Sequence, residues 1–452
     1  MATFLVKNCA VLVTMDESRR EIKDGALFSR DGIIEQVGAS ADLPKTADSV
    51  LNADGAIAIP GLVNTHHHLY QNLTRVVPAA QNASLFDWLK TLYPIWACLT
   101  PDDIYISALV GLAEMALTGC TTSSDHLYLF PNGVRLDDEI RAAQDIGVRF
   151  HATRGAMSIG ESDGGLPPDS LVEREDAILK DYERVVDAFH DASAGAMLRI
   201  GLAPCSPFSV SRGLMRDTAV VARNRGVGMH THLAENIDDI RYSQETFGMR
   251  PGQYVQELGW TGPDVWHAHC VQLNDSEIDL FARSTTGIAH CPCSNMRLAS
   301  GIAPVRQMRD AGVNVGLGVD GSASNDSGHL LNEARQAMLL QRVGGKGAGF
   351  SARDALQLAT IGGAKVLGRD DIGSLEPGKR ADVAVYDRQS LAMAGCDWDL
   401  VAGLIFCGPL KARHVYVGGK AVVSDGHLTT IDWGTAIAQH RQHTRELINR
   451  AP

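Results

Sequence analysis

The feature that most constrains the fold is a pattern repeated through the middle of the chain. A strand-like apolar run ends in polar residues and is followed by a helical stretch closed by Gly. The apolar runs lie at residues 57–68, 119–126, 147–154, 197–206, 226–235, 264–271, 286–294 and 313–321. Eight strand–helix units predict an α/β fold of the (β/α)8 barrel type. An open doubly wound sheet is the alternative, but the sequence has no phosphate-binding Gly-rich turn to favour it.

The segments on either side of this repeat alternate apolar and polar residues instead. Residues 1–56 and 380–430 have the pattern of short strands joined by Asp-Gly and Gly-Gly turns. Because segments far apart in sequence can pair in space, we expect the two ends to form one small β-sandwich beside the TIM-like barrel. The predicted division is a first sandwich part at 1–56, the barrel at 57–370, a second sandwich part at 371–430 and a helical tail at 431–452.

The charge balance argues against two classes of partner. The 452 residues include 41 Lys and Arg against 53 Asp and Glu, a net charge of −12. Polymeric nucleic acid and anionic membrane surfaces both need a basic footprint, so we expect neither. The start of the chain is interrupted by Lys7 and Asn8 and is not typical of a signal peptide. The nine scattered cysteines favour reduced thiols, so we expect a cytoplasmic protein.

Clustered histidines close several of the apolar runs. The first run ends in His66-His67-His68, and in an extended segment residues i and i+2 point the same way. His66 and His68 can therefore bind one metal ion while His67 faces elsewhere. Taken alone, this motif is equally consistent with structural histidines. Later runs end in His230, His232 and Glu235, in His267 and His269, in His290, and in Asp320.

Polar residues at the ends of several strands of one barrel indicate a shared site. Barrel active sites are built at the C-terminal ends of the strands, and core packing does not explain such a convergence. A site of three His and one Asp with an open position suits zinc, and iron is an alternative. Zinc lowers the pKa of a bound water to about 7, so hydrolysis or hydrolytic deamination is the expected chemistry. We expect His290 to be structural or to lie just behind the metal ligands.

Five segments resemble signatures of the amidohydrolase superfamily, in its branch of cytosine, guanine and adenosine deaminases. The match extends over almost the whole chain. The segments are PGLVNTHHHL from residue 60, HLAE from 232, HAHCV from 267, GVDGSASND from 318 and IGSLEPGKRADVAVYD from 372. The resemblance implies a metal-dependent barrel with a small β-sandwich, and a homo-oligomeric assembly.

The resemblance also implies a role for each matching residue. One zinc ion would be bound by His66, His68, His232 and Asp320. Glu235 would shuttle protons, His269 would polarise the substituent of the attacked carbon, and Asp320 would pass the second proton. The run LRIGLAPCS contains no lysine, so it lacks the bridging carboxylated lysine of two-metal members.

A narrower resemblance concerns the substrate. The stretches HHHLYQNLTR and TTSSDHLYLFPNG resemble those of 8-oxoguanine deaminases, with triazine hydrolases and guanine deaminases as relatives. Nucleoside-deaminating relatives carry a ribose-binding acid where this chain has Trp96, and a His where it has Cys205. Both differences favour a flat, free base. The resemblance therefore implies a small heterocyclic substrate and a place in purine metabolism, with 8-oxoguanine converted to uric acid and ammonia.

The residues that would contact the ring are open to two interpretations each. Gln71 follows the metal histidines and could pair with a purine edge, or could face solvent in a loop. Trp88 and Trp96 could stack on the ring, but FDWLKTLYPIW also has helical spacing that would bury both in the core. His126 is expected at the lip of the pocket with Tyr128. Cys205 could line the pocket or be a buried core thiol.

Two alternatives to this function remain at the level of sequence. The same metal site could serve a guanine, isocytosine or pterin deaminase, or a triazine aminohydrolase or chlorohydrolase. A catalytically silent barrel used as a structural protein is the other alternative. Such proteins usually lose metal ligands, whereas each expected ligand position is filled here.

Overall fold

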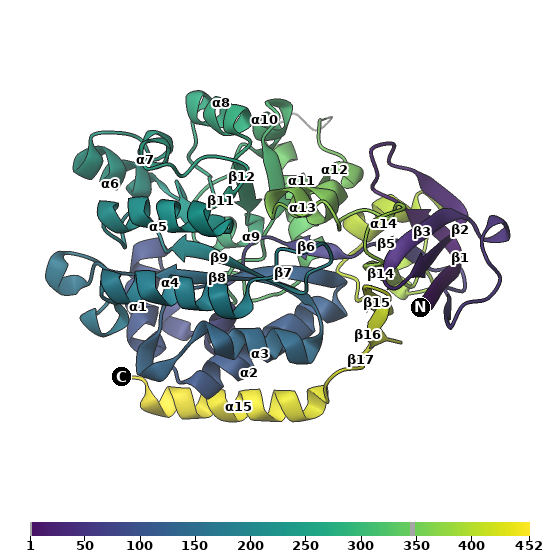
Figure 1. Ribbon diagram of the computed structural model, residues 1–452, viewed down its shortest axis with the longest axis horizontal. Helices are drawn as coiled ribbons and strands as arrows, with labels where there is room; N and C mark the ends of the chain where they lie inside the picture. The colour runs from purple at the N-terminus through teal and green to yellow at the C-terminus, as the bar shows by residue number, and fades with distance from the viewer. Residues whose placement is uncertain (1, 344–348) are drawn as a thin grey trace.

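The computed structural model describes residues 2–343 and 349–452, and its centre is a closed barrel of parallel strands (Figure 1). All eight predicted runs contribute one strand each, so the α/β barrel class is confirmed. The barrel strands are β6 (Leu62–Asn64), β7 (Cys120–Leu127), β8 (Arg149–Ala156), β9 (Leu198–Pro204), β10 (Gly228–Leu233), β11 (Val265–His269), β12 (Gly287–His290) and β13 (Asn314–Leu317).

Helices surround the barrel, and capping residues in the sequence mark several of their ends. Thr100 caps α2 in a reciprocal box with Asp103, and α3 and α5 end at the left-handed Gly147 and Gly226. The helices of the barrel region are α1 (Leu85–Trp96), α2 (Pro101–Leu117), α3 (Leu136–Ile146), α4 (Glu175–Phe189), α5 (Arg212–Arg225), α6 (Ile237–Phe247), α7 (Pro251–Glu257), α8 (Asp275–Ser284), α9 (Pro292–Arg297), α10 (Val305–Asp310), α11 (Leu330–Val343), α12 (Ala352–Gln357) and α13 (Gly363–Val366).

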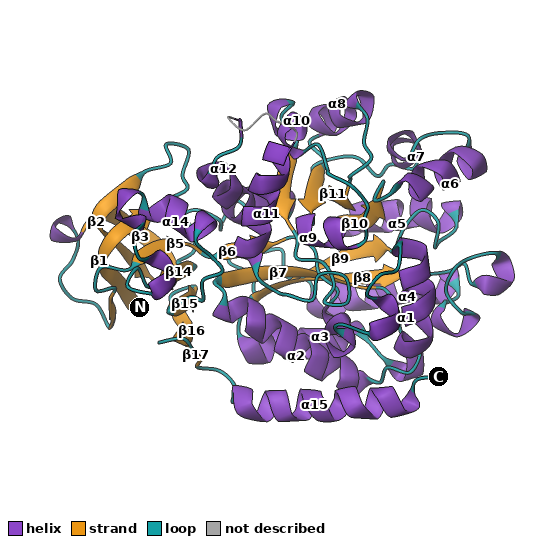
Figure 2. Cartoon of the chain, turned by 180° about the vertical axis from the view of Figure 1, so that it is seen from behind, coloured by secondary structure: helices purple, strands orange, loops and turns teal. Residues whose placement is uncertain are grey.

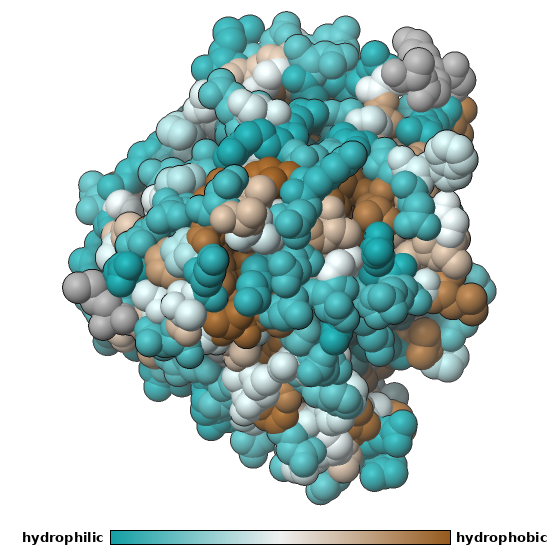
Figure 3. Space-filling view, turned by 90° about the vertical axis from the view of Figure 1, so that its right-hand side faces the viewer, coloured by the Kyte–Doolittle hydropathy of each residue, from teal (hydrophilic) through white to brown (hydrophobic). Residues whose placement is uncertain are grey.

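Strands from both ends of the chain form a second sheet beside the barrel (Figure 2). The strands expected in a sandwich belong to one hydrogen-bonded sheet, in the order β17-β16-β15-β14-β5-β1-β2-β3, with β4 paired to β1. Their bounds are β1 (Thr3–Val13), β2 (Glu21–Arg30), β3 (Ile33–Ala39), β4 (Ser49–Asn52), β5 (Ile57–Pro60), β14 (Val383–Tyr386), β15 (His414–Val417), β16 (Lys420–Ser424) and β17 (His427–Leu428). The surface at this end of the molecule is largely hydrophilic, with scattered hydrophobic patches (Figure 3).

The junction between the two sheets differs from the expected position. Residues 57–60 were expected to open the barrel, but they form β5, which pairs with β1 and with β14 of the small sheet. The barrel begins only at Leu62, after Gly61. A Cβ at Gly61 would lie 2.1 Å from Thr121 Oγ1, so only glycine lets the chain pass this close to β7.

The C-terminal segment ends in the long helix α15 (Trp433–Arg450), drawn in yellow in Figure 1. It packs along α2, where the buried carboxylate of Asp103 accepts from His443 Nδ1 at 2.7 Å and from Arg450. The small helix α14 (Leu400–Phe406) packs between α12 and the small sheet. Within the described ranges, no helix combines the length and the apolar character needed to cross a membrane.

A pair of buried carboxyl groups links β7 to α3 and predicts how stability depends on pH. Burial raises the pKa values of both Asp125 and Glu139, and the charge of Asp125 raises that of Glu139 further. Between about pH 4 and the folded-state pKa values, this pair therefore binds more protons in the folded protein than in the unfolded chain. The stability that this pair contributes is complete at low pH and is lost as pH rises through the folded-state pKa values.

We expect Glu139→Gln to weaken this loss. Its melting temperature should fall less than that of the wild-type protein between about pH 6 and about pH 9, because the amide keeps a neutral group beside Asp125. Thermal unfolding followed by circular dichroism measures the difference. Glu183→Gln, at an exposed position of α4, is the matched control and should follow the wild type. Parallel melting curves for Glu139→Gln and wild type would contradict the assignment.

Candidate functional site

Three histidines and one aspartate meet at the C-terminal end of the barrel. His66 and His68 follow β6, His232 lies in β10 and Asp320 follows β13. His68 Nε2 lies 3.1 Å from His232 Nε2, and Asp320 Oδ1 lies 3.3 Å from His66 Nε2 and 3.4 Å from His68 Nε2. The four side chains predicted to bind the metal are thus within a few ångströms of one another.

The orientation of the three imidazoles fits a metal ion. Each ring donates from Nδ1 to a fixed partner: His66 to His230 Nε2 at 2.7 Å, His68 to the carbonyl oxygen of His126 at 2.7 Å, and His232 to that of Cys205 at 2.6 Å. These bonds leave the lone pair of each Nε2 free and directed toward the space between the three rings and Asp320, as in metal-binding histidines. His66 Nε2 is buried without a hydrogen-bond partner in the described protein.

The electrostatics of these groups also suit a cation. Burial lowers the pKa values of His66, His68 and His232, the last to about 3, so the rings stay neutral. Burial alone would raise the pKa of Asp320, but its contact with His66 and the charge of His269 hold it well below the usual value. A neutral imidazole set with one ionised carboxylate is the donor set that zinc takes in catalytic sites.

Asp320 is held in an uncommon backbone conformation. Its φ is +64° and that of His269 is +68°, a region that non-glycine residues rarely adopt. Three donors fix its carboxylate: Ser294 Oγ at 2.5 Å, Ser324 Oγ at 3.1 Å and the backbone N–H of Gly321 at 2.7 Å. The surrounding hydrogen bonds therefore determine the direction in which this carboxylate points.

Two titratable groups lie beside the cluster. Glu235 Oε2 is 3.6 Å from His269 Nε2, and His269 Nδ1 donates to Asn295 Oδ1 at 2.9 Å. Burial raises the pKa of Glu235 to about 7, which places its proton exchange near neutral pH. Burial lowers the pKa of His269, but the carboxylates of Glu235 and Asp320 outweigh it and raise the value above the usual one. Glu235 can therefore accept and release a proton near neutral pH, and His269 can carry a positive charge beside it.

The pocket above these groups has an apolar, aromatic lining. Of the expected substrate contacts, Gln71, Trp88, Tyr128 and Cys205 line it. Gln71 is buried, and its Oε1 accepts from the N–H of Ala323 at 3.2 Å, while Trp88 Nε1 donates to the carbonyl oxygen of the same residue at 3.0 Å. Burial raises the pKa of the Cys205 thiol to about 12, so it is a neutral wall group.

Two expected contacts lie elsewhere. Trp96 is fully buried behind Trp88, with ring centroids 5.3 Å apart, and donates from Nε1 to Thr74 Oγ1 at 3.1 Å. Trp96 is therefore a core residue, which was the alternative interpretation of this segment. His126 is not at the lip of the pocket: it is buried beside His232, and its Nε2 donates to the carbonyl oxygen of Ala203 at 2.8 Å.

The pocket also contains residues that the sequence did not single out. Its further side chains come from α1 and from loops, and apolar residues of this kind carry no motif that would mark them. The apolar ones are Leu85, Leu89, Tyr93, Phe208 and Leu298, and Ser206 and Ser324 add two hydroxyl groups. His67 and His290 are buried outside the pocket lining, the latter as expected for a structural residue.

Comparison with known proteins gives matches over the whole fold. Residues 57–422 match the amidohydrolase family. An 8-oxoguanine deaminase from Pseudomonas aeruginosa is 45% identical, covering 94% of this chain and 95% of its own. An isoxanthopterin deaminase from an unidentified prokaryote is 36% identical, covering 92% and 90%. The crystal structure of atrazine chlorohydrolase from Arthrobacter aurescens TC1, complexed with zinc, superposes with a TM-score of 0.93 at 33% identity, covering 98% and 100%.

Proposed function

The chain belongs to the amidohydrolase family and is a hydrolase of C–N bonds, and we propose that it deaminates a free purine base, converting 8-oxoguanine and water to uric acid and ammonia. The observation that carries the proposal is the convergence of three Nε2 atoms and the Asp320 carboxylate beside Glu235, whose pKa is raised to about 7. A relative at 45% identity that acts on 8-oxoguanine supports the choice of substrate.

The proposed metal site uses one ion. His66, His68, His232 and Asp320 would bind zinc, or iron through the same donors. When bound, zinc supplies Lewis acidity and lowers the pKa of a coordinated water toward 7. The buried, neutral rings of the three histidines stay available as donors because their Nδ1 atoms are already engaged.

Glu235 and Asp320 each carry out one of the two proton transfers, and His269 stabilises charge. Glu235 accepts the proton of the attacking water and delivers it to the ring nitrogen next to the reacting carbon. Its pKa near 7 lets it perform both halves of the transfer at neutral pH. His269, with its raised pKa, stabilises the charge that develops beside that carbon. Asp320 passes the second proton to the leaving amine, so that ammonia departs.

The lining of the pocket supports a free base over a nucleoside. Among the lining residues that the structure describes, Glu235 and Asp320 are the acids, and both lie at the reacting centre. Trp96, at the position of the ribose-binding acid of relatives, lies in the core, so no acid is offered to a sugar there. Trp88, Leu85 and Leu89 provide a surface on which a planar ring can stack.

An ammonia-release assay tests the substrate. We expect kcat/KM for 8-oxoguanine to exceed that for guanine by about tenfold or more, as for a site that hydrogen-bonds the additional oxygen of a substrate like that of the 45% identical relative. Isoxanthopterin, isocytosine and an amino-triazine complete the panel, with Glu235→Gln as the blank. Guanine turned over much faster than 8-oxoguanine would refute the substrate while leaving the deaminase chemistry intact.

The remaining proposals concern the protein in its cell. The net charge of −12 supports a substrate that arrives free and not within DNA or RNA. All nine cysteines are free thiols in the structure, in agreement with a reducing cytoplasm. We propose a homo-oligomer, which light scattering of the purified protein tests directly.

A further inference from the structure

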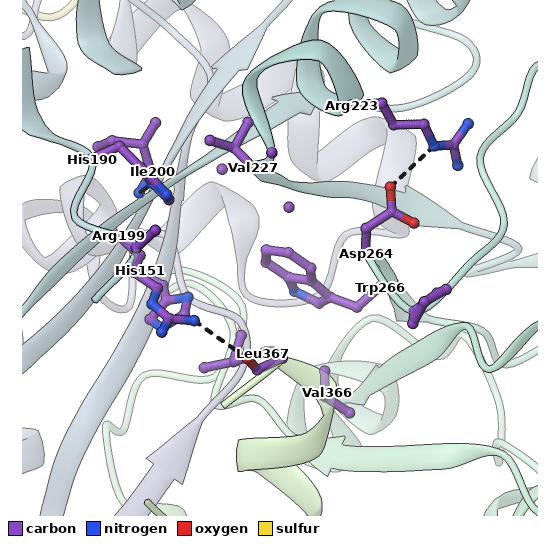
Figure 4. A pocket seen from close by; sticks show the side chains of 16 residues that line it. His151, His190, Arg199, Ile200, Arg223, Val227, Asp264, Trp266, Val366 and Leu367 are labelled. Atoms are coloured by element: carbon purple, nitrogen blue, oxygen red, sulfur yellow. Dashed lines mark hydrogen bonds and ion pairs between the residues drawn. The ribbon is translucent and has the colours of Figure 1, made fainter. Parts of the chain in front are cut away.

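A second cavity lies at the opposite end of the barrel from the metal cluster (Figure 4). Its volume is about 310 Å³, and its lining shares no residue with the active-site pocket. The walls come from the first halves of β8, β9, β10 and β11 and from the ends of α5 and α13. Ligand sites begin at about this size, so the cavity can hold a small molecule.

Two glycines and a tryptophan create this space. Barrel interiors are normally filled by layers of side chains. Here a Cβ at Gly228 would lie 2.9 Å from the Trp266 indole, and one at Gly201 would lie 3.4 Å from it. Trp266 Nε1 donates to the carbonyl oxygen of Thr65 at 3.1 Å, which fixes the ring. The flat indole therefore forms a rigid wall where side chains would otherwise close the barrel.

The cavity contains a cation without a carboxylate partner. Among the residues that the structure describes, no carboxylate oxygen lies within 4.0 Å of the Arg199 guanidinium. Its two longer contacts are to the carbonyl oxygens of Gly368 at 3.3 Å and Ser193 at 3.5 Å, and its buried Nε has no partner. Burial and the charge of Arg369 lower the pKa of Arg199, and the more distant carboxylates of nearby aspartates offset this only in part.

The other polar groups of the cavity are already balanced. Arg223, on the wall opposite Arg199 in Figure 4, pairs with Asp264 at 3.1 Å. His190 Nδ1 accepts from the N–H of Ile200 at 3.1 Å, which leaves its Nε2 as a donor. Burial lowers the pKa of His151, which keeps it neutral. The remaining walls are apolar, including Val227, Val366 and Leu367.

We propose that this cavity is a second binding site, which takes a small aromatic or heteroaromatic carboxylate with its anionic group on Arg199 and its ring against Trp266. One cation without a carboxylate in direct contact matches one negative charge, and guanidinium binds carboxylate through paired N–H groups. The apolar walls and the indole face suit a planar ring. An inorganic anion would leave these walls in contact with water and gain nothing from Trp266.

Calorimetric titration of the zinc-loaded full-length protein tests the site, with benzoate as the probe. Benzamide is the control ligand, because it has the same shape without the charge. We expect benzoate to bind at least about tenfold more tightly than benzamide, since a charge-assisted contact contributes more than about 1.4 kcal/mol. Comparable binding of the two ligands, or of inorganic phosphate and benzoate, would overturn the proposal.

A pair of variants separates this site from the metal cluster, where benzoate could also bind. Arg199→Gln should weaken benzoate binding about tenfold and leave kcat for deamination unchanged. Arg216→Gln, at an exposed arginine of α5, is the matched control and should bind as the wild type does. A crystal of the wild-type protein soaked in benzoate gives an independent readout. Benzoate absent from the cavity, or bound equally by Arg199→Gln, would show that no such site exists.

Discussion

Replacing Glu235 with Gln is expected to lower the turnover of the deaminase by about 10³-fold or more while leaving zinc bound. The amide has nearly the same shape as the carboxyl group but cannot accept a proton from water or return it to the ring. Glu235 lies outside the predicted ligand set, 3.6 Å from His269, so its loss should not release the metal. Steady-state ammonia release and metal analysis of the same preparation measure both quantities.

A matched control makes this result specific. Glu245→Gln removes a carboxylate from an exposed position of α6 and should leave turnover unchanged. The melting temperature of Glu235→Gln should not fall, because burial already disfavours its charged form. Unchanged turnover in Glu235→Gln would remove Glu235 from the mechanism. Loss of zinc in this variant would instead assign it to the metal site.

The second large effect is expected at the metal ligands. His68→Ala should reduce zinc below about 0.1 ion per chain, against about one in the wild type, and abolish deamination. His68 Nε2 lies close to both His232 Nε2 and Asp320 Oδ1, so the variant removes one of the converging donors. Inductively coupled plasma mass spectrometry after dialysis measures the zinc content.

The neighbouring histidine supplies the control. His67 is buried next to His68 in sequence, but it is not part of the cluster of potential ligands. His67→Gln should therefore retain zinc at about one ion per chain. If both variants kept their zinc, the ligand set would be wrong. If both lost it, the effect would reflect a damaged fold, which circular dichroism of the two proteins would reveal.

The fold was predictable from local patterns except at one junction. The eight apolar runs each became a barrel strand because strand propensity and the following helix are encoded within a few residues. Residues 57–63 form one apolar stretch, and its composition does not show that Ile57–Pro60 joins the small sheet and Leu62–Asn64 the barrel. The partners that divide it, β14 and β7, lie far away in sequence.

The candidate site was predictable in part: the sequence located the proposed ligands but not all of the residues that line the pocket. The proposed ligands lie at the ends of strands, which the sequence shows as polar residues directly after apolar runs. Their roles stay predictions. Trp88 and Trp96 are eight residues apart on one face of α1, so spacing could not tell which would reach the pocket. The contact of Trp88 with Ala323, which follows β13, decides it.

The sequence by itself determined the family and the barrel, and it predicted which side chains would bind a metal. These depend on residue type and on spacing within single strands, which local chemistry sets. Only the tertiary structure decided the raised pKa of Glu235, the burial of Trp96 and the cavity beside Arg199. Burial and electrostatics depend on neighbours in space that come from distant segments, so no local pattern records them.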